Sequence, residues 1–89
     1  MIAAFRLGQV YSSGTWGMPQ DDKEAVNWFR MAAERGHLES MLKMGLAYEL
    51  GKGVGQDNKQ AAEWYWQVLR KKGNDAVLEE KIRVLESGQ

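Results

Sequence analysis

The chain contains the same pattern of residues twice, and this repetition limits its fold more than any other feature. The segment YSSGTWGMPQDDKEAVNWF (residues 11–29) is matched by YELGKGVGQDNKQAAEWYW (residues 48–66), at a spacing of 36 to 37 residues. Glycine, aspartate, lysine, alanine and tryptophan recur at equivalent positions, with one extra residue in the first loop. A repeat of this period predicts stacked copies of one supersecondary unit, because each copy needs a neighbour to bury its apolar face.

Each copy predicts a helix, a loop and a second helix. The residues at three- and four-residue steps, which mark one face of a helix, are Met41, Met44, Gly45 and Tyr48 in one helix and Ala61, Tyr65, Val68 and Leu69 in the next. The first copy has Ala25, Phe29, Ala32 and Ala33 at the latter positions. Gly51 stands where a helix ends and a left-handed residue is favoured. Gly36 and Gly73 similarly close the second helix of each copy.

Aspartates mark the start of the second helix in both copies. Asp57 precedes this helix with Gln60 three residues later, and Asp21 has Glu24 at the same spacing. The spacing predicts a capping box, in which each of the two side chains bonds the backbone amide of the other residue.

Small residues on the predicted packing faces indicate a close approach of helices. Gly8 and Gly45 lie on the packing face of the first helices. Glycine costs roughly 1 kcal/mol of helix propensity relative to alanine, so its use there needs a packing reason. We expect Ala25 and Ala61 to be the counterparts on the second helices.

Residues 74–87 predict a fifth helix that caps the stack. Its inner face is predicted to contain Val77 or Leu78, with Ile82 and Leu85. The segment begins as a third copy would, but Lys81-Ile82 stands where Leu-Gly is expected and no glycine loop follows. A terminal unit with a changed pattern is typical of a solenoid cap.

These residues together resemble the Sel-1-like repeat, a relative of the tetratricopeptide repeat. The family pattern is Ala-x3-Leu-Gly-x2-Tyr-x2-Gly-x-Gly-Val, followed by Asp, Lys-Ala, Trp-Tyr and Ala-Ala-x2-Gly. The second copy matches it with Met44, Gly45, Tyr48, Gly51, Gly53, Val54, Asp57, Lys59, Ala61, Trp64, Tyr65 and Gly73. The first copy matches it with Leu7, Gly8, Tyr11, Gly14, Gly17, Asp21, Lys23, Ala25, Trp28, Phe29, Ala32, Ala33 and Gly36. The departures are Ser40, the loop residues Thr15 and Trp16, and the pair Val68-Leu69.

The resemblance implies an all-α fold, an α/α right-handed solenoid of two helix-loop-helix repeats and a C-terminal capping helix. The predicted single domain spans residues 1–89, with repeat one at 1–36, repeat two at 37–73 and the capping helix at 74–87. The family acts as an adaptor that assembles other proteins, so the resemblance implies a protein or peptide partner. Its repeated positions are structural, so it implies no catalytic residues and no cofactor.

Composition and single residues add no chemistry to this interpretation. Twelve basic and twelve acidic side chains cancel, which disfavours nucleic acid as a partner. The chain has no cysteine and one histidine, His37, so no metal-ligand set is present. The loop GKGVG lacks the spacing of a phosphate-binding loop. The sequence has no apolar run long enough to cross a membrane, and MIAAFRLGQVY lacks the features of a signal peptide.

One face of the first helices carries residues that the predicted core does not need. With Met44 at the core centre, Leu42 and Leu46 point to the opposite side, and Phe5 and Gln9 are their equivalents in the first copy. In a right-handed solenoid this face lines the concave groove. Two interpretations remain open: these residues pack one first helix on the next, or they form a partner-binding groove. The candidate partner-binding residues are Phe5, Gln9, Glu39, Leu42, Lys43, Leu46 and Glu49.

Two tryptophans and the first helix leave further alternatives. Trp16 in the first loop and Trp66 on the outer face of the fourth helix are each either a lid over the core edge or an anchor for another chain. The second functional hypothesis is a structural fragment of a longer repeat protein that self-associates through its open repeat end, with Met1, Ile2 and Phe5 as interface candidates. A homo-oligomer is then the alternative to a foreign protein partner.

Overall fold

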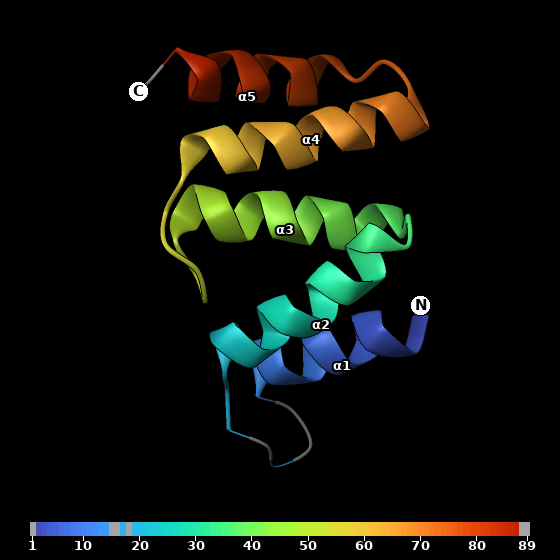
Figure 1. Cartoon of the computed structure of the whole chain (residues 1–89), viewed down its shortest axis with the longest axis vertical. Coiled ribbons are helices and arrows are strands. Elements are labelled where there is room, and N and C mark those ends of the chain that lie inside the picture. The colour runs from blue at the N-terminus through green and yellow to red at the C-terminus, as the bar shows by residue number, and fades with distance from the viewer. Residues whose placement is uncertain (1, 15–16, 18, 88–89) are drawn as a thin grey trace.

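The protein is a stack of helices along one long axis. The computed structural model describes residues 2–14, 17 and 19–87, and within these ranges it contains five helices and no strand. The helices are α1 (Ile2–Ser13), α2 (Asp22–Glu34), α3 (Leu38–Leu50), α4 (Asn58–Lys72) and α5 (Ala76–Glu86). Each helix packs on the next one along the chain, and α1 and α5 form opposite ends of the stack (Figure 1). The extents of 39 × 25 × 18 Å fit this elongated arrangement.

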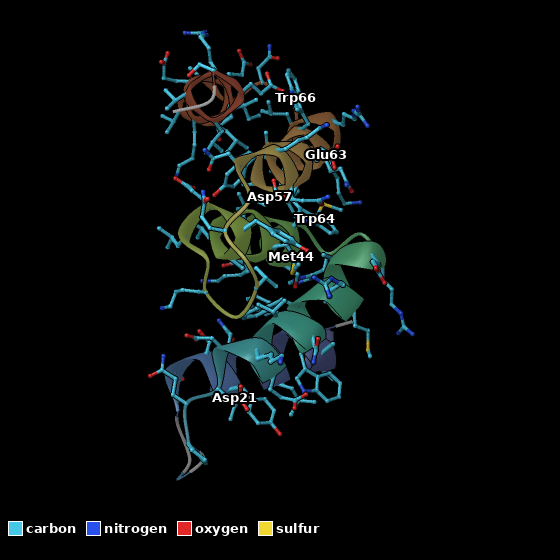
Figure 2. The ribbon with its side chains drawn as sticks, turned by 60° about the vertical axis from the view of Figure 1, so that its left-hand side comes forward. Asp21, Met44, Asp57, Glu63, Trp64 and Trp66 are labelled. Atoms are coloured by element: carbon cyan, nitrogen blue, oxygen red, sulfur yellow. The ribbon has the colours of Figure 1, made fainter. Side chains whose placement is uncertain are left out.

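The predicted all-α repeat fold is confirmed. We call α1, α3 and α5 the A helices, and α2 and α4 the B helices. Apolar side chains from every interface between A and B helices meet in one continuous core. Its most deeply buried large side chains include Met44, Val68, Tyr65 and Ile82. Met44 lies in the middle of the stack on α3 (Figure 2), so the predicted core centre is confirmed.

Aromatic rings, and not alanines, cover the two A-helix glycines. A Cβ atom added to Gly8 would lie 2.6 Å from Cε1 of Phe29, and one added to Gly45 would lie 2.5 Å from Cε1 of Tyr65. The expectation that Ala25 and Ala61 are the counterparts of these glycines is therefore wrong. Both alanines are buried, but the flat ring one turn further along each B helix makes the closest approach.

The predicted aspartate N-caps are present, but they do not form the predicted capping boxes. The Asp21 carboxylate accepts a hydrogen bond from the Glu24 amide, and the Asp57 carboxylate accepts from the amides of Lys59 and Gln60. The backbone amide of each aspartate donates to the preceding A helix, at 2.8 Å to the Tyr11 carbonyl and 2.9 Å to the Tyr48 carbonyl.

These two amides are therefore unavailable to the side chains of Glu24 and Gln60, and the capping-box prediction fails at both positions. The bonds from aspartate to tyrosine instead tie each B-helix start to the A helix before it. Gly51 ends α3 in the left-handed conformation as predicted, with φ 72°.

His37 caps the N-terminus of α3, a role that the sequence pattern did not indicate. Its Nδ1 accepts a hydrogen bond from the Ser40 amide at 3.3 Å and lies 2.8 Å from the Ser40 hydroxyl oxygen. Its ring contacts the ring of Phe5, with 4.7 Å between centroids. The histidine thus joins the start of α3 to α1.

The fifth helix begins at the Asp75 N-cap, which fixes its register relative to α3. Met44 is the seventh residue after His37 and Ile82 is the seventh after Asp75, so these two core residues are equivalent. Ile82-Arg83, and not Lys81-Ile82, therefore stands where Leu-Gly is expected. Of the two residues left open for the inner face, Leu78 is buried and Val77 is 82% exposed.

Candidate protein-binding surface

The A helices present a row of equivalent positions on one side of the stack. Lys43 and Lys81 are both the sixth residue after an N-cap. Arg6 is equivalent to Lys43, because each stands two residues before the glycine that an aromatic ring covers. One cation per A helix thus stands on the same side. We call this side, which contains Arg6, Lys43 and Lys81, the A-helix face.

A groove runs between α3 and α5 on this face, with a volume of about 330 Å³. The Tyr65 ring from α4 lies at its base. Four of the candidate residues line it, together with residues from α5 and the turn before it. The lining residues are Glu39, Leu42, Lys43, Leu46, Tyr65, Lys72, Asp75, Val77, Leu78 and Lys81. The structure therefore brings Glu39, Leu42, Lys43 and Leu46 together, as predicted, although their partner-binding role stays a prediction.

A hydrogen-bonded cluster holds the base of this groove in place. The Tyr65 hydroxyl donates to the Glu49 carboxylate at 2.8 Å, and the Lys81 ammonium lies 3.2 Å from the same oxygen. The Lys81 Nζ is also 5.6 Å from the centroid of the Tyr65 ring. Burial raises the pKa of the Tyr65 phenol well above its usual value, and the adjacent Glu49 carboxylate raises it further. The phenol therefore stays protonated and links α3, α4 and α5.

A second ion pair marks the end of the groove near the α5 N-terminus. The Lys72 ammonium lies 3.0 Å from the Asp75 carboxylate. The hydrogen bond from Lys72, followed by that from the Leu78 amide, lowers the pKa of the Asp75 carboxyl below its usual value. The Asp75 carboxylate is thus bonded to the Leu78 amide and to Lys72. Apolar side chains form the floor of the groove.

A second groove lies between α1 and α3 and has a different chemical character. Its volume is about 560 Å³, and the Phe29 ring contributes to its base, as Tyr65 does in the other groove. Its lining residues are Arg6, Gln9, Val10, Ser12, Ser13, Phe29 and Lys43. Two cations and several polar groups line it, and none of its described lining residues is acidic. Lys43 lines both grooves, so the two form neighbouring parts of one face.

The remaining candidate residues lie elsewhere. Phe5 packs against the core, with its ring centroid 5.7 Å from that of Phe29, and it lines neither groove. Glu49 holds Tyr65 and Lys81 from the end of α3. Trp66 lies beside α5 in Figure 2, where its indole nitrogen donates to Glu86 at 2.9 Å. Trp16 lies outside the described residues.

Neither a metal-ligand cluster nor a membrane-spanning helix occurs among the described residues. Among residues 2–14, 17 and 19–87, no three His, Asp or Glu side chains are grouped as metal ligands would be. Over the same described part of the chain, every helix is too short or too polar to cross a membrane.

Comparison with solved structures supports the repeat fold directly. The chain resembles a protective antigen of uropathogenic Escherichia coli strains, which displays an SLR fold, with a TM-score of 0.76 and 41% sequence identity. The likeness covers 82% of this chain and 15% of that one.

Curated relatives match this chain over a small part of their own length. The chain is 36% identical over 62 residues to Protein SHC1 of Saccharomyces cerevisiae, covering 70% of this chain and 12% of that protein. It is 35% identical over 75 residues to the chitin synthase regulator SKT5 of Malassezia restricta, covering 83% of this chain and 5% of the regulator. The Sel1 repeat pattern itself matches residues 2–37 and 38–65. The chain belongs to the Sel1 repeat family.

Proposed function

We propose that this chain is a non-catalytic interaction module that binds a segment of another protein along the A-helix face. The observation that carries the proposal is the pair of neighbouring grooves between α1, α3 and α5, which share Lys43 and have an aromatic ring in each base. A preformed groove with exposed apolar and charged groups suits peptide capture, because little of the binding energy is lost to reorganisation.

Family membership and the relatives support an adaptor role. The Sel1 repeat pattern covers most of the chain, and the repeated positions in it serve packing. The relative from Malassezia restricta is a regulator of chitin synthase, which is a role exercised through another protein. The chain corresponds to a small part of these relatives, so its own partner is not inferred from theirs.

The test is a double truncation on the A-helix face. Short random peptides are displayed on phage and selected on the whole chain, and the enriched peptides are then measured against Leu42→Ala with Leu46→Ala. We expect affinity to fall about tenfold or more, since two apolar contacts are removed from the groove. Met31→Ala is the matched control, because Met31 on α2 is 42% exposed and Leu46 is 37% exposed.

Circular dichroism checks that both variants keep their helices. The proposal fails if the double variant binds the selected peptides as well as the unaltered chain does. It also fails if the selection yields no peptide whose binding depends on the A-helix face.

A specific observation also favours self-association as a second candidate function. Leu7 on α1 is 40% exposed, whereas the equivalent residues Met44 and Ile82 are 0% and 1% exposed beneath the preceding B helix. We infer that a second copy of the chain covers this apolar side of α1. Sedimentation equilibrium over a concentration series tests the inference: Leu7→Lys should abolish a dimer, and a concentration-independent monomer contradicts it.

A further inference from the structure

We propose that the partner segment is acidic, and that Arg6 and Lys43 bind its carboxylates in the α1–α3 groove while the α3–α5 groove takes an adjacent apolar side chain. The inference rests on the proposed peptide-binding function and assigns the chemistry of the partner. Three observations carry it: the equivalent placement of the cations, the absence of an acidic partner for two of them among the described residues, and the contrast between the two grooves.

The cations occupy one structural position in successive A helices. Arg6, Lys43 and Lys81 each stand at the same point of the repeat, and each lines one or both grooves. The whole chain has twelve basic and twelve acidic residues, so this row is not the consequence of a generally basic composition. A row of like charges at repeat spacing suits an extended chain that carries the opposite charge.

Two of these cations have no acidic partner within the described residues. Lys81 is paired with Glu49, and Lys72 at the end of the same groove is paired with Asp75. The three ion pairs among the described residues do not include Arg6 or Lys43. Both side chains therefore remain available to an incoming carboxylate. Arg6 can accept a carboxylate through two parallel hydrogen bonds, a geometry that gives orientation as well as affinity.

The lining of the α1–α3 groove favours an anion. Gln9 and Ser12 add polar groups beside the two cations, and the part of the chain that the structure describes contributes no acidic side chain to this lining. The adjoining cavity toward the α3–α4 loop is lined by one acid, Asp22, and by two bases, Lys52 and the shared Lys43, so Asp22 offsets only one of the two positive charges. The surplus of positive charge is therefore localised around Arg6 and Lys43.

The neighbouring groove excludes a simple polyanion as the preferred occupant. Leu42, Leu46 and Val77 give the α3–α5 groove an apolar lining, and Glu39 stands at its edge. A uniformly negative polymer would place its charge beside the Glu39 carboxylate and would leave these apolar side chains exposed to water. A peptide with Asp or Glu followed by an apolar residue satisfies both grooves, so we commit to a peptide and not to nucleic acid.

The test compares two matched pairs of charge removals in the whole chain. Peptides selected from the random library should be enriched in Asp or Glu together with an apolar residue. Arg6→Gln with Lys43→Gln should weaken their binding about tenfold or more, because each substitution removes a charge-assisted hydrogen bond to a peptide carboxylate. Lys23→Gln with Arg70→Gln removes the same charge from exposed positions on the B helices and should change affinity less than about twofold.

Each outcome distinguishes the acidic partner from the proposed function. If the selected peptides depend on Leu42 and Leu46 but are not acidic, or bind the Arg6 and Lys43 double variant normally, the acidic partner is wrong and peptide binding stands. If single-stranded nucleic acid outcompetes every selected peptide, the commitment to a peptide is overturned. If no peptide depends on the A-helix face, both proposals fail.

Discussion

Tyr65 packs its ring so closely on Gly45 that the backbone of α3 itself forms the contact surface. A Cβ atom at residue 45 would lie 2.5 Å from Cε1 and 2.8 Å from Cδ1 of the ring. Phe29 covers Gly8 in the same way, so both repeats depend on a ring against a bare stretch of helix. A tyrosine ring cannot deform, and its hydroxyl is held by Glu49. The contact therefore leaves no room for a side chain.

Gly45→Ala should consequently destabilise the protein, although alanine is the better helix former. Overpacking a core costs typically 1–3 kcal/mol, and the gain of about 1 kcal/mol in helix propensity offsets part of this. We expect a net loss of up to about 2 kcal/mol in the free energy of unfolding by urea. Gly55→Ala is the control, since an added Cβ there meets nothing within 4 Å. A Gly45→Ala variant at least as stable as the unaltered chain would contradict the packing described.

The buried Tyr65 phenol predicts a loss of stability at alkaline pH. Its folded pKa lies well above the ordinary value of 10.0, because burial and then Glu49 oppose ionisation. The stabilising effect is complete below pH 10, where the phenol is protonated in both states. It is lost as the pH rises from 10 toward the folded pKa, because the unfolded chain ionises first.

At pH 11 this effect should lower the free energy of unfolding by about 1 kcal/mol relative to neutral pH. Urea unfolding curves at both pH values measure it in the unaltered chain and in Tyr65→Phe, which should lose less stability between them. Tyr11→Phe serves as the control for removing a phenol elsewhere. Equal pH dependence of the unaltered chain and Tyr65→Phe would show that Tyr65 does not ionise on unfolding as described.

The helix pattern could be predicted from the sequence because it depends on local periodicity. The glycine at the end of α3, the aspartate N-caps and the inner faces of α3 and α4 all follow from three- and four-residue spacing. What covers each glycine could not be predicted, because it depends on how two helices rotate against each other. Spacing alone pairs small residues with small residues, whereas the structure pairs Gly8 with Phe29.

Two other failures have the same physical origin. The capping boxes fail because the amides of Asp21 and Asp57 bond carbonyls nine to ten residues earlier in the chain, and local spacing contains no such information. The predicted register of α5 is wrong by one residue, because the Asp75 N-cap places Ile82-Arg83 at the Leu-Gly position, whereas a constant repeat length placed Lys81-Ile82 there. The candidate groove residues on α3 could be predicted from one face of a single helix. Val77 and Lys81 could not be assigned to the groove, because their place in it depends on how α5 packs.

The His37 cap gives a prediction that separates capping from ring packing. His37→Ala removes both the acceptor for the Ser40 amide and the contact with Phe5, and it should cost about 1 kcal/mol or more. His37→Asp restores an N-cap acceptor without the ring. Because both variants lack the ring contact, the difference between them measures the cap, which we expect to be about 0.5–2 kcal/mol in favour of Asp. The capping role would be contradicted if urea unfolding showed the His37→Ala variant to be at least as stable as the His37→Asp variant.

The capping helix should depend on one side chain. Ile82 is almost fully buried against α4, at the position that Met44 holds in α3, whereas Val84 on the same helix is exposed. Ile82→Ala should cost about 2–5 kcal/mol, because it leaves a cavity in the packed interface between α4 and α5. Val84→Ala should change stability by less than about 0.5 kcal/mol.

Amide hydrogen exchange along α5 distinguishes local detachment from global unfolding. In Ile82→Ala we expect protection to fall first between residues 76 and 86, while α3 keeps more of its protection. Loss of protection to the same extent in all helices would mean that the stack unfolds as one unit and that α5 is part of it. Full protection of α5 in this variant would contradict the anchoring role of Ile82. It would mean that other contacts, such as the hydrogen bond from Trp66 to Glu86, hold the helix.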